Sequence, residues 1–190
     1  MDFMRNTLLF GLLLSLPSTI LAQQSGEIEV SPEKIISRFE CKLDAPLDNV
    51  FQALADVENH SRILSNIVNR TVVSREKLSS VLKENEVLTV STVVEPEERI
   101  AFALFRLFPP NRVEEEMLTD PFFSAESAAV GPQDRKKGSI YWDLTDADGA
   151  TIVEIYSEFA PRTGRVYTAE RVNRIWSSHC ELLQADALSR

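Results

Sequence analysis

The end of the chain constrains its fold more than any other stretch. Residues 151–159 alternate between apolar and polar side chains, the pattern of a strand with one buried face. Pro161 ends this strand, and an amphipathic run with apolar positions at helical spacing then extends to Leu188. At 1.5 Å per residue this run predicts a helix of roughly 35–40 Å, long enough to cross the full width of a small sheet.

The first 22 residues have the pattern of a secretory signal peptide. Arg5 supplies a positive start, residues 8–16 are apolar, and Ala22 offers a small residue for cleavage. The apolar run is too short for an ordinary spanning helix, and an uncleaved membrane anchor is the alternative. We therefore expect an exported protein, periplasmic or secreted, with residues 23–33 as a flexible lead-in and residues 34–190 as one domain.

Composition excludes several classes of function. The formal net charge of −9 argues against a nucleic acid partner, because phosphates favour clustered Lys and Arg. The six glycines are scattered, so no phosphate-binding loop is present, and no spaced Cys and His pairs suggest a metal site. We expect no metal and no cofactor.

The chain has two cysteines, Cys41 and Cys180. Export makes a disulfide between them chemically feasible. The alternative is that both are small buried hydrophobic residues. Sequence alone does not fix the distance between them, so both interpretations stay open.

Before the C-terminal helix, the pattern is one strand, two helices and then mostly strands. Residues 35–43 alternate as a strand, Ala45-Pro46 opens a helix, and Asn59 can cap a second short helix from His60 to about Asn66, with His60 exposed at its start. Further strands are predicted at 71–73, 80–82, 86–94, 100–108, 111–118 and 138–144, with 121–123 leading towards 125–130.

Sequential hairpins of this kind imply an antiparallel sheet. The predicted fold class is α+β, with a curved antiparallel sheet of about six or seven strands around the long C-terminal helix. One helix cannot fill the concave side of such a sheet, which indicates a cavity.

Four segments in this order resemble the START-like superfamily, also called SRPBCC, of polyketide cyclase/dehydrase and lipid transport proteins. They are 45–55, 56–64, 138–144 and 151–161 with the helix that follows. The resemblance covers about 35–188 and is nearest to the coenzyme Q-binding-like branch, although Ile63 stands where an aromatic residue is common. It implies a helix-grip fold with a hydrophobic ligand cavity, and it carries no universal catalytic motif.

Ten side chains are candidates for ligand contact. Eight are apolar and are predicted to converge between sheet and helix, with plain core packing as the alternative. Arg106 interrupts an apolar run, so it could pair with a carboxylate, orient a ligand's polar head or reach solvent. The ligand-binding set is Phe39, Arg106, Trp142, Val153, Ile155, Phe159, Val172, Ile175, Trp176 and His179.

The leading functional hypothesis is a non-enzymatic binder of a hydrophobic small molecule, lipid or quinone-like. One alternative is a cyclase or aromatase-like enzyme, in which His179, Tyr156, Tyr141 or Arg106 would move protons. The other is a protein-interaction module. If residues 100–110 form an exposed hairpin, their aromatic side chains could also contact a membrane peripherally.

Overall fold

The computed structural model describes residues 24–73, 82–94, 98–118, 136–161 and 166–190. The signal-like segment and the predicted segments at 80–81 and 121–130 lie outside these residues. The strands are β1 (Gln24–Val30), β2 (Ile35–Leu43), β3 (Ile67–Val72), β4 (Glu86–Val94), β5 (Glu98–Phe108), β6 (Arg112–Leu118), β7 (Lys136–Ala147) and β8 (Ala150–Phe159). The helices are α1 (Leu47–Ala55), the 3-10 helix η1 (Val57–Arg62) and α2 (Ala169–Leu188).

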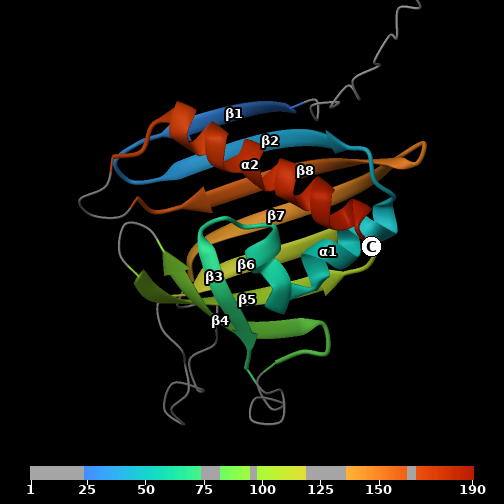
Figure 1. The fold of residues 1–190 in the computed structure, drawn as a ribbon. Coiled ribbons are helices and arrows are strands. Elements are labelled where there is room, and N and C mark those ends of the chain that lie inside the picture. The colour runs from blue at the N-terminus through green and yellow to red at the C-terminus, as the bar shows by residue number, and fades with distance from the viewer. Residues whose placement is uncertain (1–23, 74–81, 95–97, 119–135, 162–165) are drawn as a thin grey trace, which may run out of the picture.

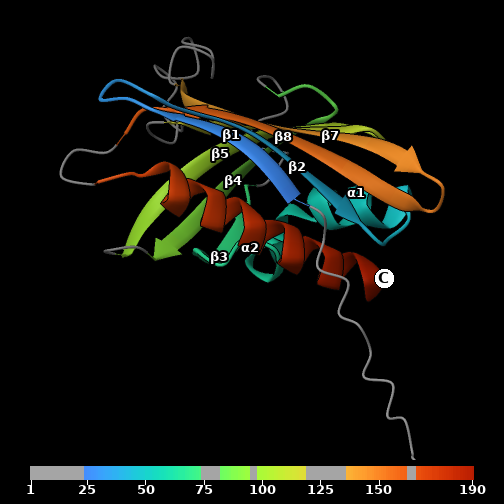
Figure 2. The same ribbon diagram turned by 90° about the horizontal axis from the view of Figure 1, so that it is seen from above.

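The strands form one curved antiparallel sheet in the order β1-β2-β8-β7-β6-β5-β4-β3. All three helices lie on the same side of it, and α2 crosses over β1, β2 and β8 (Figures 1 and 2). The predicted α+β helix-grip fold is confirmed, with eight strands among the described residues. No helix in the described part of the chain has both the length and the apolar character needed to cross a membrane.

The extra strand is β1, in the segment that the sequence predicts to be a flexible lead-in. That prediction is wrong for residues 24–30, which pair with β2 along their whole length. An edge strand with one exposed side needs few apolar residues, and only Ile28 packs against the core. At Gly26 a Cβ would come within 2.5 Å of the Phe39 ring, so the absence of a side chain lets β1 lie against β2.

Local sequence explains the start of α2. Thr168 is its N-cap, since the Thr168 hydroxyl accepts a hydrogen bond from the Arg171 amide at 3.1 Å. The helix has 20 residues and is therefore about 30 Å long, shorter than predicted, because residues 166–168 are not helical. Its buried stripe is Val172, Trp176, His179, Cys180, Leu183, Asp186 and Ala187.

The helix predicted after Ala45-Pro46 is confirmed as α1, with Pro46 at its N-cap. The second short helix is displaced: η1 ends at Arg62 instead of continuing to residue 66. Asn59 does not cap it, because the Asn59 amide donates to the Asp56 carboxylate at 2.9 Å.

Two faces of the sheet carry different side chains. We call the face covered by α2 the inner face, and it bears Phe39, Trp142 and Ile155 of the main core. The outer face bears Arg38 and Tyr156, which alternate with them. A second small apolar cluster of Leu88, Leu104 and Leu118 lies on the outer face of β4, β5 and β6.

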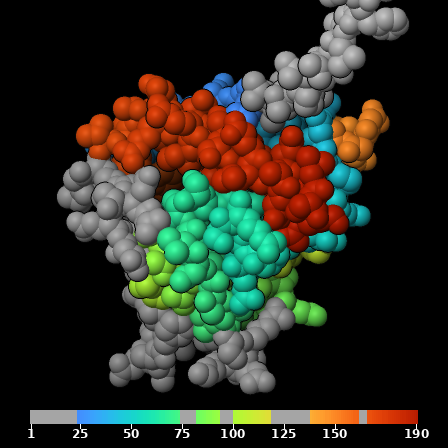
Figure 3. All heavy atoms as spheres, viewed as in Figure 1, coloured from blue at the N-terminus to red at the C-terminus, as the bar shows by residue number. Residues whose placement is uncertain are grey.

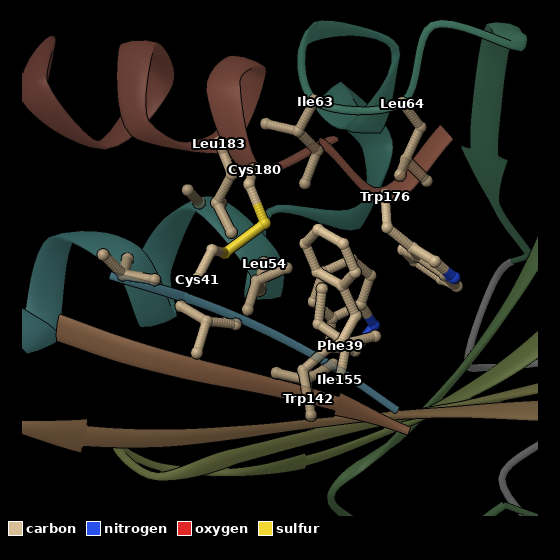
Figure 4. Packing of buried hydrophobic residues seen from close by; sticks show 14 of the residues in the cluster. Phe39, Cys41, Leu54, Ile63, Leu64, Trp142, Ile155, Trp176, Cys180 and Leu183 are labelled. Atoms are coloured by element: carbon tan, nitrogen blue, oxygen red, sulfur yellow. A yellow bond between two sulfur atoms is a disulfide. The ribbon is translucent and has the colours of Figure 1, made fainter. Parts of the chain in front are cut away.

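A disulfide ties the inner face to α2. Cys41 of β2 and Cys180 of α2 are bonded, their Cα atoms are 6.5 Å apart, and neither side chain is exposed (Figure 4). The question that the sequence leaves open is therefore answered by the structure, which places both residues at the contact between strand and helix.

Candidate functional site

Aromatic side chains from the sheet and from α2 meet beneath the helix. Trp142 and Trp176 lie edge to face with ring centroids 5.7 Å apart, and Phe39 and Ile155 are beside them (Figure 4). The Trp176 indole N–H donates to the Ser37 hydroxyl at 2.8 Å. Ser37 in turn shares a 2.6 Å hydrogen bond with the Ser157 hydroxyl. This hydrogen-bonded chain fixes the orientation of the Trp176 ring.

Most of the predicted ligand contacts are brought together on this side of the sheet. The buried members are Phe39, Trp142, Val153, Ile155, Val172, Trp176 and His179. Phe159 is half-buried at the margin, where its ring packs against Tyr167 at 6.0 Å. Ile175 is 39% exposed, so the prediction that it converges with the others is wrong. Contact of the remaining residues with a ligand stays a prediction.

Arg106 lies on the other side of the sheet. Its neighbour Phe105 is fully buried in the main core, so alternation sends Arg106 to the outer face. There its guanidinium pairs with Glu86 at 2.8 Å, with Glu116 at 3.1 Å and with Glu114 at 3.6 Å. Of the three roles that the sequence leaves open for Arg106, pairing with carboxylates is the one observed. The prediction that Arg106 belongs with the ligand contacts beneath α2 is wrong, because its side chain lies on the outer face.

His179 is the unusual group on the inner side of α2. Its side chain is buried, and its ring lies edge to face against Trp176 at 5.3 Å. Among the residues that the structure describes, neither ring nitrogen has a hydrogen-bond partner. Burial lowers the pKa of His179 to about 4, so the ring is neutral at pH 7 and offers one donor and one acceptor. An unpaired buried polar group costs about 1–3 kcal/mol, which a polar partner would recover.

A second buried histidine provides a direct contrast. His60 Nε2 donates to the Leu54 carbonyl at 2.7 Å, which leaves Nδ1 to accept from the Arg70 guanidinium at 2.6 Å. Burial and then the charge of Arg70 lower the pKa of His60 to about 3. The prediction that His60 is exposed is wrong, because η1 turns its ring under the helix layer, where it packs against Phe105.

Arg70 completes this cluster and has no signal in the sequence, where it stands in the polar run Asn-Arg-Thr. Its guanidinium lies over the Phe105 ring at 4.8 Å and also donates to Ser91 at 2.8 Å and to the Glu115 carboxylate at 3.1 Å. Both charged side chains are nearly inaccessible, at 4% and 7% exposure. Because each Arg70 nitrogen is hydrogen-bonded, we interpret the cluster as structural support beside the site.

Three surface depressions lined by described residues lie away from the contact between α2 and the sheet. One of about 610 Å³ is bordered by Arg38 and Tyr156, and one of about 560 Å³ by Tyr141 and Tyr156, both on the outer face. A third of about 350 Å³ lies beside β4 and includes Leu82. None of these three lies between α2 and the sheet, so the cavity expected there from the sequence stays a prediction.

Tyr141 and Tyr156 form part of a continuous row across the outer face. Their rings are 5.9 Å apart, Arg38 lies over Tyr156 at 5.6 Å, and Arg112 lies over Tyr141 at 5.0 Å. Three of the four side chains that a cyclase would use on the sequence evidence therefore face away from the helix. Only His179 is on the inner side.

The hairpin considered for membrane contact is instead the strand β5 and the turn after it. Phe105 is fully buried, whereas Ile100 and Phe108 near the two ends are 56% and 41% exposed. The condition for that hypothesis, an exposed hairpin over residues 100–110, is not met. Among the described residues there is also no cluster of three or more side chains suited to hold a metal ion.

No protein-family model and no curated protein matches the sequence significantly. Solved structures do match the fold. They include the ZhuI aromatase/cyclase from Streptomyces sp. R1128, with a TM-score of 0.59, 14% identity, and coverage of 83% of this chain and 95% of that one. Human STARD10 matches with a TM-score of 0.58 and 9% identity over 86% of this chain and 73% of its own. Ara h 8.0201 matches with a TM-score of 0.53 and 12% identity over 89% and 99%.

At these identities the likeness shows the fold alone. The helix-grip arrangement expected from the START-like resemblance is therefore confirmed, and the chain shares it with an aromatase/cyclase and with STARD10. The activities of those proteins are not carried over by fold.

Proposed function

We propose that this protein is an exported binder of one hydrophobic small molecule, lipid or quinone-like, held on the inner face of the sheet beneath α2. The observation that carries the proposal is an aromatic inner face covered by α2, with the His179 imidazole buried there and without a hydrogen-bond partner among the described residues. Binding would be driven by apolar burial at roughly 25 cal/mol per Å², with few polar contacts to set orientation.

Export rests on two supporting features. Residues 1–22 have the pattern of a signal peptide. The Cys41–Cys180 bond is of a kind that persists mainly in oxidising compartments. A fusion of residues 1–30 to alkaline phosphatase, which is active only after export in a bacterial host, tests this part separately. Absence of phosphatase activity would contradict it.

Admission of the ligand would involve the N-terminal half of α2. The C-terminal half is held by the Cys180 disulfide, by a hydrogen bond from the Asn49 amide to the Ala187 carbonyl at 3.1 Å, and by Arg190 pairing with Asp56 at 2.9 Å. The N-terminal half is held through the Trp176 hydrogen bond to Ser37 and by apolar contacts. We therefore place the opening at residues 169–176.

The two tryptophans give a direct assay, because they are the only ones in the chain and both lie at the proposed site. Titration with 1,6-diphenylhexatriene, an uncharged apolar molecule that absorbs tryptophan emission, should quench the fluorescence saturably at one molecule per protein. Trp142→Phe and Trp176→Phe should each keep part of the signal, whereas Tyr141→Phe on the outer face should leave the titration unchanged. Failure of this probe and of retained lipids in native mass spectrometry would contradict the proposal.

A cyclase function is less well supported. The likeness to an aromatase/cyclase concerns the fold, and Tyr141, Tyr156 and Arg106 face away from the inner side. The interaction-module hypothesis would apply to the outer face and stays a prediction.

A further inference from the structure

The position of His179 on α2 defines which side of the helix it faces. Asp186 follows seven residues later, so both side chains lie on the same stripe of the helix. The Asp186 carboxylate lies 3.7 Å from the Arg62 guanidinium of η1, which shows that this stripe faces η1. We call the contact between this stripe and residues 62–64 the α2–η1 seam. Ile63 and Leu64 point into the core near Cys180 and Trp176 of α2 (Figure 4).

The seam is closed in the structure. α2 lies directly against η1 in the space-filling view, with no gap over the seam (Figure 3). Ile63 and Leu64 are 2% and 6% exposed, and His179 is 6% exposed. The imidazole is therefore enclosed mainly by apolar surface and shielded from solvent.

Neighbouring polar groups on the described part of α2 have other partners. The Asp186 carboxylate accepts from Arg190 at 2.8 Å and lies near Arg62, the Trp176 N–H donates to Ser37, and Cys180 is in the disulfide. His60 is buried to a similar extent, yet both of its nitrogens are paired. Within the described part of the chain, both nitrogens of His60 are thus paired, whereas His179 keeps one donor and one acceptor for another partner.

We propose that His179 hydrogen-bonds the polar group of the bound molecule, and that this molecule is an apolar body bearing a neutral hydroxyl or carbonyl. The inference rests on the proposed function, and it adds the chemical class of the ligand and the residue that recognises its polar group. A hydroxyl can accept from the imidazole N–H or donate to its other nitrogen, and a carbonyl can accept from the N–H. A charged head group would enter the seam at a high desolvation cost, since the charged side chains there are already paired with each other.

The test uses three probes of nearly equal size: 2-naphthol, 2-methoxynaphthalene and 2-methylnaphthalene. They present a hydroxyl, an acceptor oxygen and no polar atom. Affinities are measured by tryptophan quenching and calorimetry for the wild type, for His179→Leu and for the control Glu181→Gln, whose side chain is exposed on α2. The naphthol to methylnaphthalene affinity ratio should fall about tenfold in His179→Leu, as expected for loss of one buried hydrogen bond, and should not change in Glu181→Gln.

A ratio that is the same in wild type and His179→Leu would overturn the inference and leave the proposed function standing. No binding of any of the three probes to the wild type would overturn both.

If His179→Leu does not fold, the wild type provides a second test through ¹⁵N NMR of its only two histidines. On addition of 2-naphthol, a ring nitrogen of His179 should shift while both nitrogens of His60 stay in place, because those are already paired. With 2-methylnaphthalene the nitrogen shift should be much smaller. Equal nitrogen shifts of His179 with the two probes would overturn the inference.

Discussion

Removing the Cys41–Cys180 disulfide should destabilise the domain severely. The bond closes a loop across 139 residues of sequence, from the second strand to the last helix. In the chain-entropy model, a loop of this length restricts the unfolded chain by about 5 kcal/mol, near the upper end of the usual effect. Because a domain of this size has roughly 5–15 kcal/mol of stability in total, the loss would be a large fraction of it.

The assay is equilibrium urea unfolding, monitored by tryptophan fluorescence, for the oxidised wild type, the reduced wild type and the double variant Cys41→Ala with Cys180→Ala. With a urea dependence of about 2 kcal/mol per M, the midpoint should fall by roughly 2.5 M in both bond-free forms. A thiol titration of the oxidised protein, in which no cysteine is free, confirms the starting state. A midpoint shift below about 0.5 M on reduction would refute the reasoning.

Three further predictions concern the buried groups and α2. Glu115→Gln leaves the Arg70 cation, which is 4% exposed, without its carboxylate partner, so the free energy of unfolding should fall by about 3–5 kcal/mol. The control Glu170→Gln, at an exposed ion pair, should change it by less than about 0.5 kcal/mol, and equal effects of the two variants in urea unfolding would contradict this. Because the pKa values of His60 and His179 are lowered to about 3 and about 4, the unfolded chain binds more protons between pH 6.5 and pH 4. The stability gained by keeping both rings neutral is thus present above pH 6.5 and is lost as the pH falls. The free energy of unfolding should fall by at most about 1.4 kcal/mol per pH unit for each ring. In His179→Leu, the histidine contribution to this slope between pH 6 and pH 5 should be half that of the wild type. A flat profile there would show that the histidines are not buried neutral. In hydrogen exchange, amides of residues 169–175 should exchange faster than those of residues 180–187, because the disulfide and Asn49 hold the second half; uniform exchange along α2 would contradict the proposed opening.

The long helix, the α1 helix and the antiparallel order of the strands could be predicted because each follows from local periodicity. The strand β1 could not, since an edge strand with one exposed side shows few apolar residues, and Ile28 alone packs against the core. Glycine, not an apolar side chain, makes the close approach to Phe39.

Arg106 shows that alternation along a strand does not by itself tell which face of the sheet packs against α2. Its even-numbered neighbours in β5, Phe102 and Leu104, are as apolar as the odd-numbered ones, because Leu104 belongs to the second cluster on the outer face. The sequence therefore indicates two apolar faces without saying which one α2 covers. The prediction for Ile175 is wrong for a similar reason, because this residue lies at the edge of the apolar stripe of α2, where the side chains become exposed.

The buried polar groups depend on contacts between residues far apart in the sequence, which no local pattern reveals. Arg70, His60 and Glu115 come from three separate elements and meet only in the folded sheet. The pairing of Cys41 with Cys180 likewise follows from the place where α2 crosses β2. That His179 has no hydrogen-bond partner among the described residues can be seen only in the folded structure.

The central claim is that an apolar molecule binds between α2 and the inner face of the sheet. Nuclear Overhauser effects between bound 2-naphthol and the protein test it most directly. The protons of the ligand should contact the indoles of both Trp142 and Trp176, which lie 5.7 Å apart on opposite sides of that interface. Contacts confined to Tyr141 and Tyr156 of the outer face would contradict the account.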